Sequence, residues 1–509
     1  MRRVSGHGQP ARKMLERWAR GVGNSRHVAR RTSACHVMVA ATVEPMPVQR
    51  ADADESIEDA VERLDDQVAR RLLVSAAEWH EDVMRAVRLA AAGESERLAV
   101  LKAAVDDGLR TRRHLDYWAS SAWARDAAPV VDALADEVAA APSAELVVLL
   151  QRAAGHLVKV IMRADDSDGT IGELCRDVLD LHRQACAAGV ADPQKLAKWM
   201  VRFAFEDQDF FETDPVVYAG ALGEKGLAVY RWEVAKRSDP AYAPGDRSAT
   251  LRDYYGGFPS FAAKYATERL AIIDRDIDRL VELLGGDLSS PHQFQRVAEA
   301  MVELGQADDA LRWARRGIAE TSGWQVAKLY DLAAELLTDA DDLDEVVELR
   351  RHHHERMPSA STYAKLKVGA EAIDAWAAEV ARARAVLAER DPAGYIDALL
   401  ADGEADEAWA VATTGDHEIQ ASQWLRLAEA REPTAPGDAM GVYLRLADEV
   451  LVRADKRSYR DAVRHLKAAR RAATAADRTA EFTEHLTGLR ERNRRRPSFM
   501  AMLDKAGLR

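Results

Sequence analysis

The chain has 509 residues, of which 48% are hydrophobic and 6% aromatic, and its formal net charge is −13 at pH 7. This length leaves room for two to four domains of about 150 residues, and the apolar content suffices for a packed core. The acidic balance excludes a surface that attracts nucleic acid as a whole. The charge is uneven, because 10 Lys/Arg stand against 2 Asp/Glu in residues 1–50, 16 against 7 in residues 451–509, and 45 against 75 between them.

Residues 1–50 differ from the rest of the chain, being rich in Arg, Gly, Ser and His. We expect a basic, disordered tail there, with one short helix over residues 11–20. The three cysteines, Cys35, Cys175 and Cys186, are odd in number and scattered, which is not a disulfide framework and indicates a reducing, cytoplasmic location. No apolar run reaches the roughly 18 residues of a membrane span, so we expect no membrane association.

Helical periodicity dominates from Ser56 onward, and no alternating run is long enough to predict a strand. Helices are expected over residues 72–91, 94–106 and 127–140, and longer ones between 147 and 285. The irregular stretch 238–261 is a candidate hinge between two lobes. The expected helix breaks are Gly93, Gly108, Pro129 and Pro142, and the prolines expected at helix starts are Pro193, Pro215 and Pro291.

A repeated phrase organises the stretch from Pro291 onward. Residues 305–311 (GQADDAL) are echoed by residues 341–347 (DDLDEVV), by residues 403–409 (GEADEAW) and more weakly before Met440. Their aligned small residues are separated by 36, 62 and 31 positions, and the midpoint of the gap of 62 falls at Ala377, inside a helical run. A period of 31 to 36 residues is typical of tetratricopeptide-like helical hairpins, whose period is about 34. The aligned small residues are Ala310, Val346, Ala408 and Ala439.

The predicted fold class is therefore all-α, an α-solenoid of tetratricopeptide-like helical hairpins with an N-terminal helical lobe. The expected domains are the basic tail over residues 1–50, the helical lobe over 51–260 and the helical-repeat region over 261–509. Trp313, Trp324 and Trp409 are expected to pack inside the repeats rather than to serve as recognition platforms.

Several long phrases resemble one bacterial family. They are residues 163–182, 214–237, 291–357, 397–412 and 459–473, and together they are similar to the helical C-terminal region of SWIM zinc finger proteins, which are common in high-GC bacteria. The resemblance covers residue 55 to the C-terminus. It implies a helical repeat region behind a small zinc-binding module, and it implies no activity for that region.

The zinc finger itself is not recognisable in this sequence. A SWIM finger uses C-x-C and C-x-H, four ligands suited to tetrahedral zinc. The N-terminal region offers Cys35 beside His36, with His7 and His27 nearby, so no zinc ligands are carried over. Either the finger has been lost or the true start lies upstream; we therefore expect no cofactor, with zinc only if a finger precedes this chain.

Two groups of potential metal ligands have simpler interpretations. The acidic turn from Asp165 to Asp168 resembles part of a calcium loop but lacks both end ligands, which favours a turn with a helix cap. Cys175, His182 and Cys186 share one helical face, but the outer two are about 16 Å apart along the axis, so the three cannot hold one metal. Buried thiols beside a satisfied core histidine are the expected outcome.

Other conspicuous motifs carry no catalytic signature. Consecutive helical residues point about 100° apart, so His352, His353 and His354 do not converge, and we expect a solvated helix face. The glycines from Gly220 to Gly226 lack the spacing of a phosphate loop and indicate a helix turn. Since no hydrolase or dinucleotide motif occurs either, we expect the protein not to be an enzyme.

A basic stripe near the C-terminus is the strongest candidate site. Four of its residues would lie along one helix and three follow later in the chain, where they suit phosphates or an acidic partner, but a polar outer face on a terminal repeat explains the same residues without a ligand and is the favoured interpretation. Our first hypothesis is a non-enzymatic scaffold that binds a protein or peptide, and the alternative is a nucleic-acid-associated protein that uses its basic ends. The oligomeric state stays open. The candidate contact residues are Arg460, Arg464, Lys467, Arg471, Arg494, Arg495 and Arg496.

Overall fold

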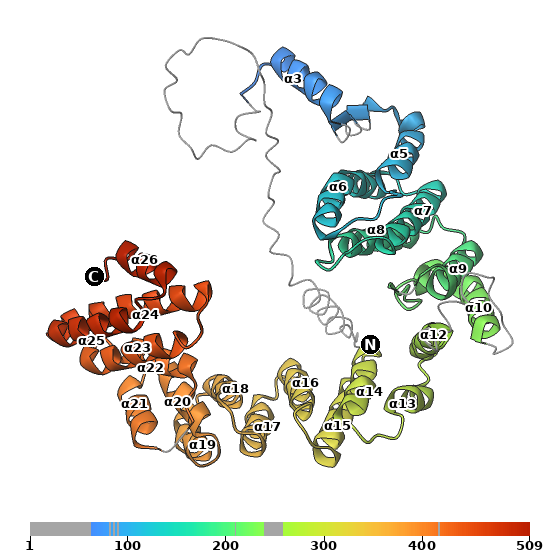
Figure 1. Ribbon diagram of the computed structural model, residues 1–509. Helices are drawn as coiled ribbons and strands as arrows, with labels where there is room; N and C mark the ends of the chain where they lie inside the picture. Colours follow the sequence, from blue (N-terminus) through green and yellow to red (C-terminus); the bar gives the residue numbers. More distant parts are fainter. Residues whose placement is uncertain are drawn as a thin grey trace, which may run out of the picture. The chain divides into compact units, whose positions relative to one another are not determined.

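The computed structural model describes residues 63–80, 83–84, 87–88, 91–208, 210–238, 258–415 and 418–509. Over these residues the chain forms 22 α-helices and one π-helical turn, η1 (Phe203–Asp207), with no strand. The one extended pairing found there is an isolated parallel bridge between Leu115 and Ala164. The predicted fold class is confirmed: the protein is an all-α solenoid of helical hairpins (Figure 1).

The described chain divides into two compact units. Unit 1 takes in the described residues up to Leu284 together with Glu303–Gly305, and unit 2 consists of Gly285–Val302 and Gln306–Arg509. The domain boundaries expected at residues 50 and 260 stay predictions. The tail over residues 1–50, its helix over residues 11–20, and most of the candidate hinge, residues 239–257, lie outside the described residues.

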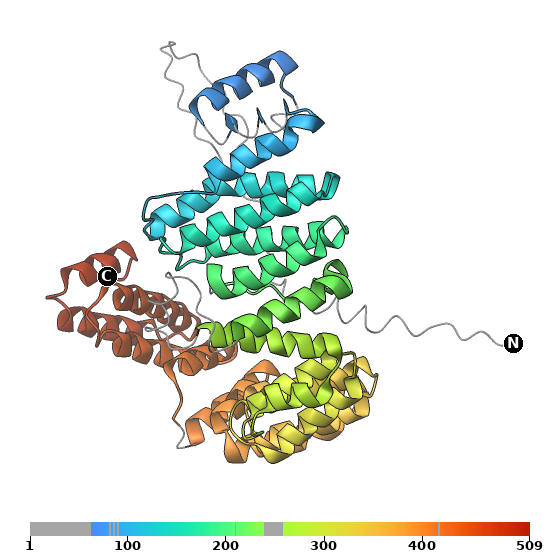
Figure 2. The same ribbon diagram turned by 90° about the vertical axis from the view of Figure 1, so that its right-hand side faces the viewer.

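Unit 1 is a stack of long helices around one continuous core, visible as the blue to green layers of Figure 2. Helix starts are set by capping side chains: Ser143 accepts a hydrogen bond from Leu146 N (3.1 Å), and Asp192 accepts one from Lys195 N (2.9 Å). The helices of this unit are α3 (Asp66–Trp79), α5 (Glu94–Gly108), α6 (Tyr117–Ala140), α7 (Ala144–Ile161), α8 (Thr170–Ala187), α9 (Pro193–Arg202), α10 (Ala219–Ser238), α12 (Phe258–Asp274) and α13 (Ile277–Gly285).

The prolines singled out in the sequence have their expected places in three cases out of five. Pro142 lies in the break between α6 and α7, as expected. Pro193 and Pro291 are the first residues of α9 and of α14 (Pro291–Glu303), as expected. Pro215 begins a turn, and α10 starts four residues later. Pro129 was expected to break a helix, which is wrong, because it lies inside the 24-residue α6. The buried neighbours Ala127, Val130 and Val131 hold that turn against the core, so packing outweighs the missing hydrogen bond.

Unit 2 is a row of helical hairpins (Figure 1). Its helices run from α14 through α15 (Ala307–Glu320), α16 (Val326–Asp339), α17 (Leu343–Arg356), α18 (Ala360–Glu371), α19 (Trp376–Arg390), α20 (Pro392–Ala401), α21 (Ala405–Thr414), α22 (Ala421–Arg431), α23 (Pro436–Val450), α24 (Lys456–Ala475) and α25 (Thr479–Arg492) to α26 (Pro497–Lys505).

The same turn recurs inside these hairpins and explains the repeated phrase. After α14, Gly305 has a φ of 74°, and the next amide, Gln306 N, donates to Met301 O (2.9 Å). This is a Schellman-type helix end, in which a left-handed residue returns the chain toward the next helix. Left-handed residues occupy the corresponding turns after α16, α18, α20 and α24, namely Asp341, Asp374, Gly403 and Asp477.

The small residues that aligned the repeats are buried, as the helical period predicts. Ala310, Ala408 and Ala439 have no exposed surface and Val346 has 7%. Ala377, the predicted midpoint, is exposed near the start of α19 and follows the left-handed Asp374 by three residues instead of five, so the predicted midpoint is out of register by two residues. The cores of unit 2 are separate clusters along the row of hairpins, for example one around Tyr330 and another around Tyr443. No helix among the described residues combines the length and the apolar character that crossing a bilayer would need.

Candidate functional site

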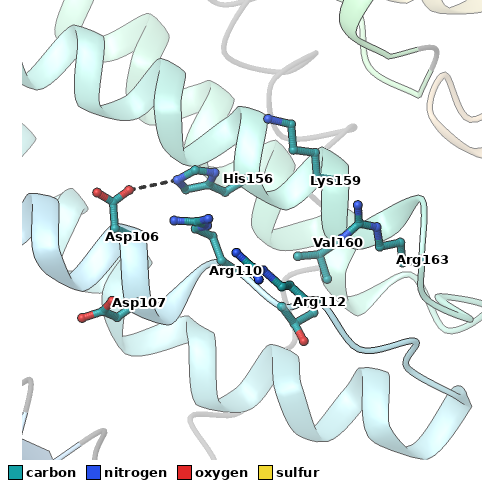
Figure 3. Close-up of a pocket in the computed structure, with 9 residues that line it drawn as sticks. Asp106, Asp107, Arg110, Arg112, His156, Lys159, Val160 and Arg163 are labelled. Atoms are coloured by element: carbon teal, nitrogen blue, oxygen red, sulfur yellow. Dashed lines mark hydrogen bonds and ion pairs between the residues drawn. The ribbon is translucent and has the colours of Figure 1, made fainter. Parts of the chain in front are cut away.

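A cationic hollow of about 470 Å³ opens on unit 1 beside the C-terminal end of α5 (Figure 3). One wall is α7, and the other is the end of α5 and the loop that leads to α6. Figure 3 shows two aspartates at one end of the hollow and Lys159 and Arg163 toward the other. Its lining residues are Asp106, Asp107, Arg110, Thr111, Arg112, His156, Lys159, Val160 and Arg163.

The loop between α5 and α6 is held in place on both sides of its arginines. Leu109 is fully buried and Leu115 is 7% exposed, so each anchors one end of the loop in the core. Leu115 N also donates to Arg163 O (3.2 Å), and Asp165 N donates to Leu115 O (2.8 Å). This short bridge ties the loop to the turn after α7. The backbones that carry Arg110 and Arg112 are therefore fixed relative to Arg163.

The positive charge of the hollow is available to a ligand. Arg110, Arg112, Lys159 and Arg163 are all exposed. In the part of the chain that the structure describes, no carboxylate forms an ion pair with any of the four. Four like charges this close repel one another, so a bound anion would lower the electrostatic free energy of the site.

One of the two aspartates is already neutralised by partners of its own. Asp106 accepts from Arg152 Nε (2.5 Å) and Nη2 (2.9 Å) and contacts His156 Nε2 at 3.0 Å. The hydrogen bond from Arg152 chiefly holds the pKa of Asp106 down, at about 2, so the carboxylate stays ionised. Asp107 is exposed and lies next to it at the same end of the hollow (Figure 3). The acidic end and the cationic end of the hollow are thus separate.

His156 is the histidine that lines the hollow, and it contacts Asp106. Burial lowers the pKa of its imidazole, and the charges of Arg152 and Arg110 lower it further, whereas Asp106 raises it. The net direction is downward, which favours the neutral ring at pH 7. The hydroxyl of Thr111 accepts from Arg113 N (3.2 Å). The lining thus offers cations and hydrogen-bond donors without an activated nucleophile, an arrangement suited to holding an oxyanion.

Two residues of the predicted basic stripe on α24 form ion pairs within the protein. Arg471 forms a bidentate pair with Glu432 (2.6 and 2.8 Å), and Arg464 pairs with Asp461 (3.1 Å). Arg460 and Lys467 are exposed on the same helix, and within the described residues neither has an acidic partner.

The three arginines after α25 differ in their partners and in their exposure. Arg494 pairs with Glu491, and Arg496 donates to Leu451 O (2.7 Å) and is half-buried. Arg495 is exposed and has no ion pair among the described residues. Of the seven candidate contacts, Arg460, Lys467 and Arg495 are the ones left unpaired, and their role stays a prediction.

Cys175, His182 and Cys186 lie on α8 and are fully buried. The Gln151 amide contacts His182 Nε2 (3.1 Å), and His182 Nδ1 lies 2.8 Å from the Tyr218 hydroxyl. Burial lowers the pKa of His182 to about 3 and raises the pKa of each thiol to about 12. The expected satisfied histidine beside buried thiols is what the structure shows.

The acidic turn before α8 also serves the helix. Asp166 accepts from Ile171 N (2.9 Å) and Gly172 N (2.8 Å), and Asp168 accepts from Thr170 N (3.3 Å), so both carboxylates cap the helix. Asp168 bonds to Ser121 and Thr170, and Gly169 takes a φ of 74°. No group of three or more His, Cys, Asp or Glu side chains is placed to hold a metal within the described ranges. Cys35, His36, His7 and His27 lie outside those ranges.

The three histidines of α17 were expected on a solvated face, which is wrong for two of them. His353 is fully buried and stacks on Tyr330 with ring centroids 4.2 Å apart, and neither of its nitrogens has a hydrogen-bond partner. His354 is 1% exposed and donates from Nε2 to Ala383 O (3.0 Å). Only His352 is exposed. In a solenoid, each inner helix contacts the hairpin before it and the hairpin after it, so a wide arc of α17 is covered.

Two smaller expectations have opposite outcomes. Trp324 was expected to pack and is 72% exposed, which corrects that prediction, whereas Trp313 and Trp409 are partly buried against neighbouring cores. The glycines from Gly220 to Gly226 lie in α10, as expected. Gly223 interrupts the helix with a φ of 52°, and a Cβ at Gly226 would lie 2.8 Å from Pro193 O, so α9 and α10 approach closely there.

Sequence reasoning missed the cationic hollow. Its two walls are separated by more than 40 residues in the chain, and they are joined by the bridge at Leu115 and by the contacts of Asp106 with Arg152 and His156. One signal existed: the run Leu109 to His114 (LRTRRH) places three arginines in a short link between two helices.

No protein-family model matches this chain, and no curated protein matches it. Among solved structures, the chain is similar to a circular tandem repeat protein with novel repeat topology and enhanced subunit contact surfaces. The match covers 87% of this chain and 95% of the other at 16% identity, with a TM-score of 0.18. A likeness with so low a TM-score carries no argument about the fold, which stands on the helices and turns described above.

Proposed function

We propose that the protein is a non-enzymatic helical-repeat scaffold that binds a protein or peptide partner. The supporting observation is a contrast between the polar groups that are buried in the core and those that are exposed to a ligand. The thiols and the histidine of α8 are buried in packing, while the cations of the hollow on unit 1 are exposed and unpaired. Such a surface suits recognition of an acidic group rather than its conversion. Helical repeats also suit this role, because each hairpin leaves one face open along the stack.

The kinship with SWIM zinc finger proteins belongs to this proposal and rests on the long phrases quoted above. A cytoplasmic location is part of it too, and the free buried thiols Cys175 and Cys186 are compatible with it. Intact mass and zinc content of the native protein, purified from its own cells, test the kinship. Bound zinc together with a mass above 56.2 kDa would support a finger joined to this chain.

The scaffold proposal is tested by isolating the tagged full chain from its own cells after chemical cross-linking and nuclease treatment. We expect one protein to be recovered in near-stoichiometric amount and to bind the purified chain again in isolation. Recovery of no such protein would contradict the proposal.

The same preparation without nuclease tests the nucleic-acid alternative. If that alternative holds, material absorbing at 260 nm co-purifies, is released by salt, and is lost from a variant that carries Arg460→Glu, Lys467→Glu and Arg495→Glu. These three are preferable to the paired arginines, since reversing Arg471 would also break its ion pair with Glu432.

A further inference from the structure

We propose that the cationic hollow on unit 1 binds a phosphate monoester dianion, such as the phosphorylated serine or threonine side chain of the scaffold's partner. The inference rests on the proposed function for the source of the phosphate, but the site itself can be tested alone.

The number and kind of cations favour phosphate. Three arginines and one lysine line the hollow without acidic partners among the described residues, and they come from two walls that a backbone bridge holds together. A phosphorylated side chain carries a charge of about −1.5 to −2 at pH 7 and three acceptor oxygens. The planar guanidinium can form two parallel hydrogen bonds to such a group. A carboxylate, with a single charge and two oxygens, would leave more of the site's cations unpaired.

The dimensions favour a single phosphorylated group over a nucleic-acid strand. A volume of about 470 Å³ holds one phosphorylated side chain with its neighbours. The lining contains no Phe, Tyr or Trp on which a base could stack, and stacking provides much of the affinity for single strands. The chain between its two basic ends carries an excess of acidic residues, which repels a long polyanion but leaves a local site intact.

The aspartates of the hollow define how the ligand would enter. Asp106 is held by Arg152 and His156 at the end opposite Arg163. A dianion would therefore lie toward Arg112, Lys159 and Arg163, away from the carboxylates. Asp107 would repel an acidic residue placed beside the phosphate on that side.

The test uses the full chain and isothermal titration calorimetry with three probes: O-phosphoserine, inorganic phosphate and serine. We expect O-phosphoserine and inorganic phosphate to bind and serine not to bind. Arg112→Glu and Lys159→Glu should each weaken the binding of O-phosphoserine tenfold or more. The matched control is Arg113→Glu, which makes the same charge change on the same loop at a residue that does not line the hollow. It should change the affinity by no more than about threefold, the part due to long-range charge.

Several results would overturn the inference. The first is that O-phosphoserine does not bind at millimolar concentration. The second is that inorganic phosphate binds but O-phosphoserine does not. The third is that Arg113→Glu weakens the binding of O-phosphoserine as much as Arg112→Glu does. Tighter binding of a single-stranded oligonucleotide than of a peptide with the same number of phosphates would also overturn it, in favour of nucleic acid. Thermal unfolding of each variant checks that the fold is retained. If the partner still binds the Arg112→Glu variant, the inference that the hollow binds the partner's phosphate is contradicted, whereas the scaffold proposal is not.

Discussion

The two units of this protein bury their apolar side chains in different ways. In unit 1 the buried side chains from Leu101 to Ala266 form one continuous cluster. In unit 2 they form separate clusters, and charged side chains link successive hairpins: Arg351 pairs with Glu379, and Arg384 pairs with Asp402. A continuous core transmits a defect to the whole unit, whereas separate cores confine it to neighbouring hairpins. Substitutions matched between the units can test that difference.

The largest effect is expected at Gly317 in α15. A Cβ there would lie 2.6 Å from Phe294 Cβ and 2.7 Å from Leu329 Cδ1, so the helices must separate to accept it. We expect Gly317→Ala to lower the free energy of unfolding of unit 2 by about 3 kcal/mol. The control, Gly441→Ala in α23, has nothing within 4 Å of the new Cβ and should stabilise by up to about 1 kcal/mol. Denaturant unfolding measures both, and equal effects would contradict the tight packing at Gly317.

The next effect concerns Asp402, which links two hairpins. It accepts hydrogen bonds from Lys367, Arg384 and the Tyr363 hydroxyl, each at 2.7 Å. Burial alone would raise its pKa, but these partners hold the pKa below its usual value. Its contribution to stability is therefore present above pH 4 and is lost as the pH falls through that lowered pKa.

We expect Asp402→Asn to cost about 3 kcal/mol at pH 7, because two cations lose a half-buried partner. Asp406→Asn, at an exposed carboxylate paired with Arg431, should cost less than about 1 kcal/mol. Hydrogen exchange should show the loss around α18 to α21 and not in unit 1. A loss spread evenly over both units would contradict the separation of cores.

Acid should destabilise both units through buried histidines, although the two histidines differ in their partners. Burial lowers the pKa of His353 to about 4 and of His182 to about 3. The unfolded chain binds these protons near pH 6.5, so stability is complete above that pH. It falls by up to about 1.4 kcal/mol per histidine for each pH unit between 6.5 and the folded value.

His353→Phe should keep the stacking on Tyr330 and remove two nitrogens that have no hydrogen-bond partner. We therefore expect the free energy of unfolding at pH 7 to be unchanged or higher, and its decrease between pH 6.5 and 4.5 to be smaller. His182→Phe should cost about 2 kcal/mol at pH 7, because Gln151 and Tyr218 lose their partner. Urea unfolding from pH 4.5 to 7.5 measures both slopes. An unchanged slope in the His353 variant would contradict this account.

The smallest effect is expected for the exposed pair between Arg315 and Glu345, which joins α15 to α17. Both side chains are about 40% exposed, so solvent screens their attraction. A double-mutant cycle to alanine should give a coupling energy of about 0.2 to 1 kcal/mol that decreases with added salt. A coupling above 2 kcal/mol would mean that surface charge, rather than the local cores, joins the hairpins.

The repeat could be predicted from sequence because it depends on local pattern. Gly305 and Gly403 mark left-handed turns, and Ala310 and Ala408 follow five residues later on the buried face. The burial of His353 could not be predicted, since a polar residue gives no sign of being covered by the next hairpin. The hollow depends on the bridge between Leu115 and Ala164 and on the contacts of Asp106 with α7, which no spacing in the chain reveals. The burial of His353 and the hollow both result from a meeting of segments that are distant in the chain.

The recurrent left-handed turn has a consequence for how this chain can change its length over generations. The buried clusters of unit 2 are each shared by neighbouring hairpins, as in the cluster that α14, α15 and α16 form, and Asp341 and Asp374 close equivalent turns 33 residues apart. Duplication or loss of a gene segment of that length would add or remove a whole hairpin and disturb only the two neighbouring contacts. Unit 1 has no such point of insertion or deletion, because its buried side chains form one continuous cluster. We therefore expect natural length variation among relatives to fall in unit 2, in steps of one hairpin.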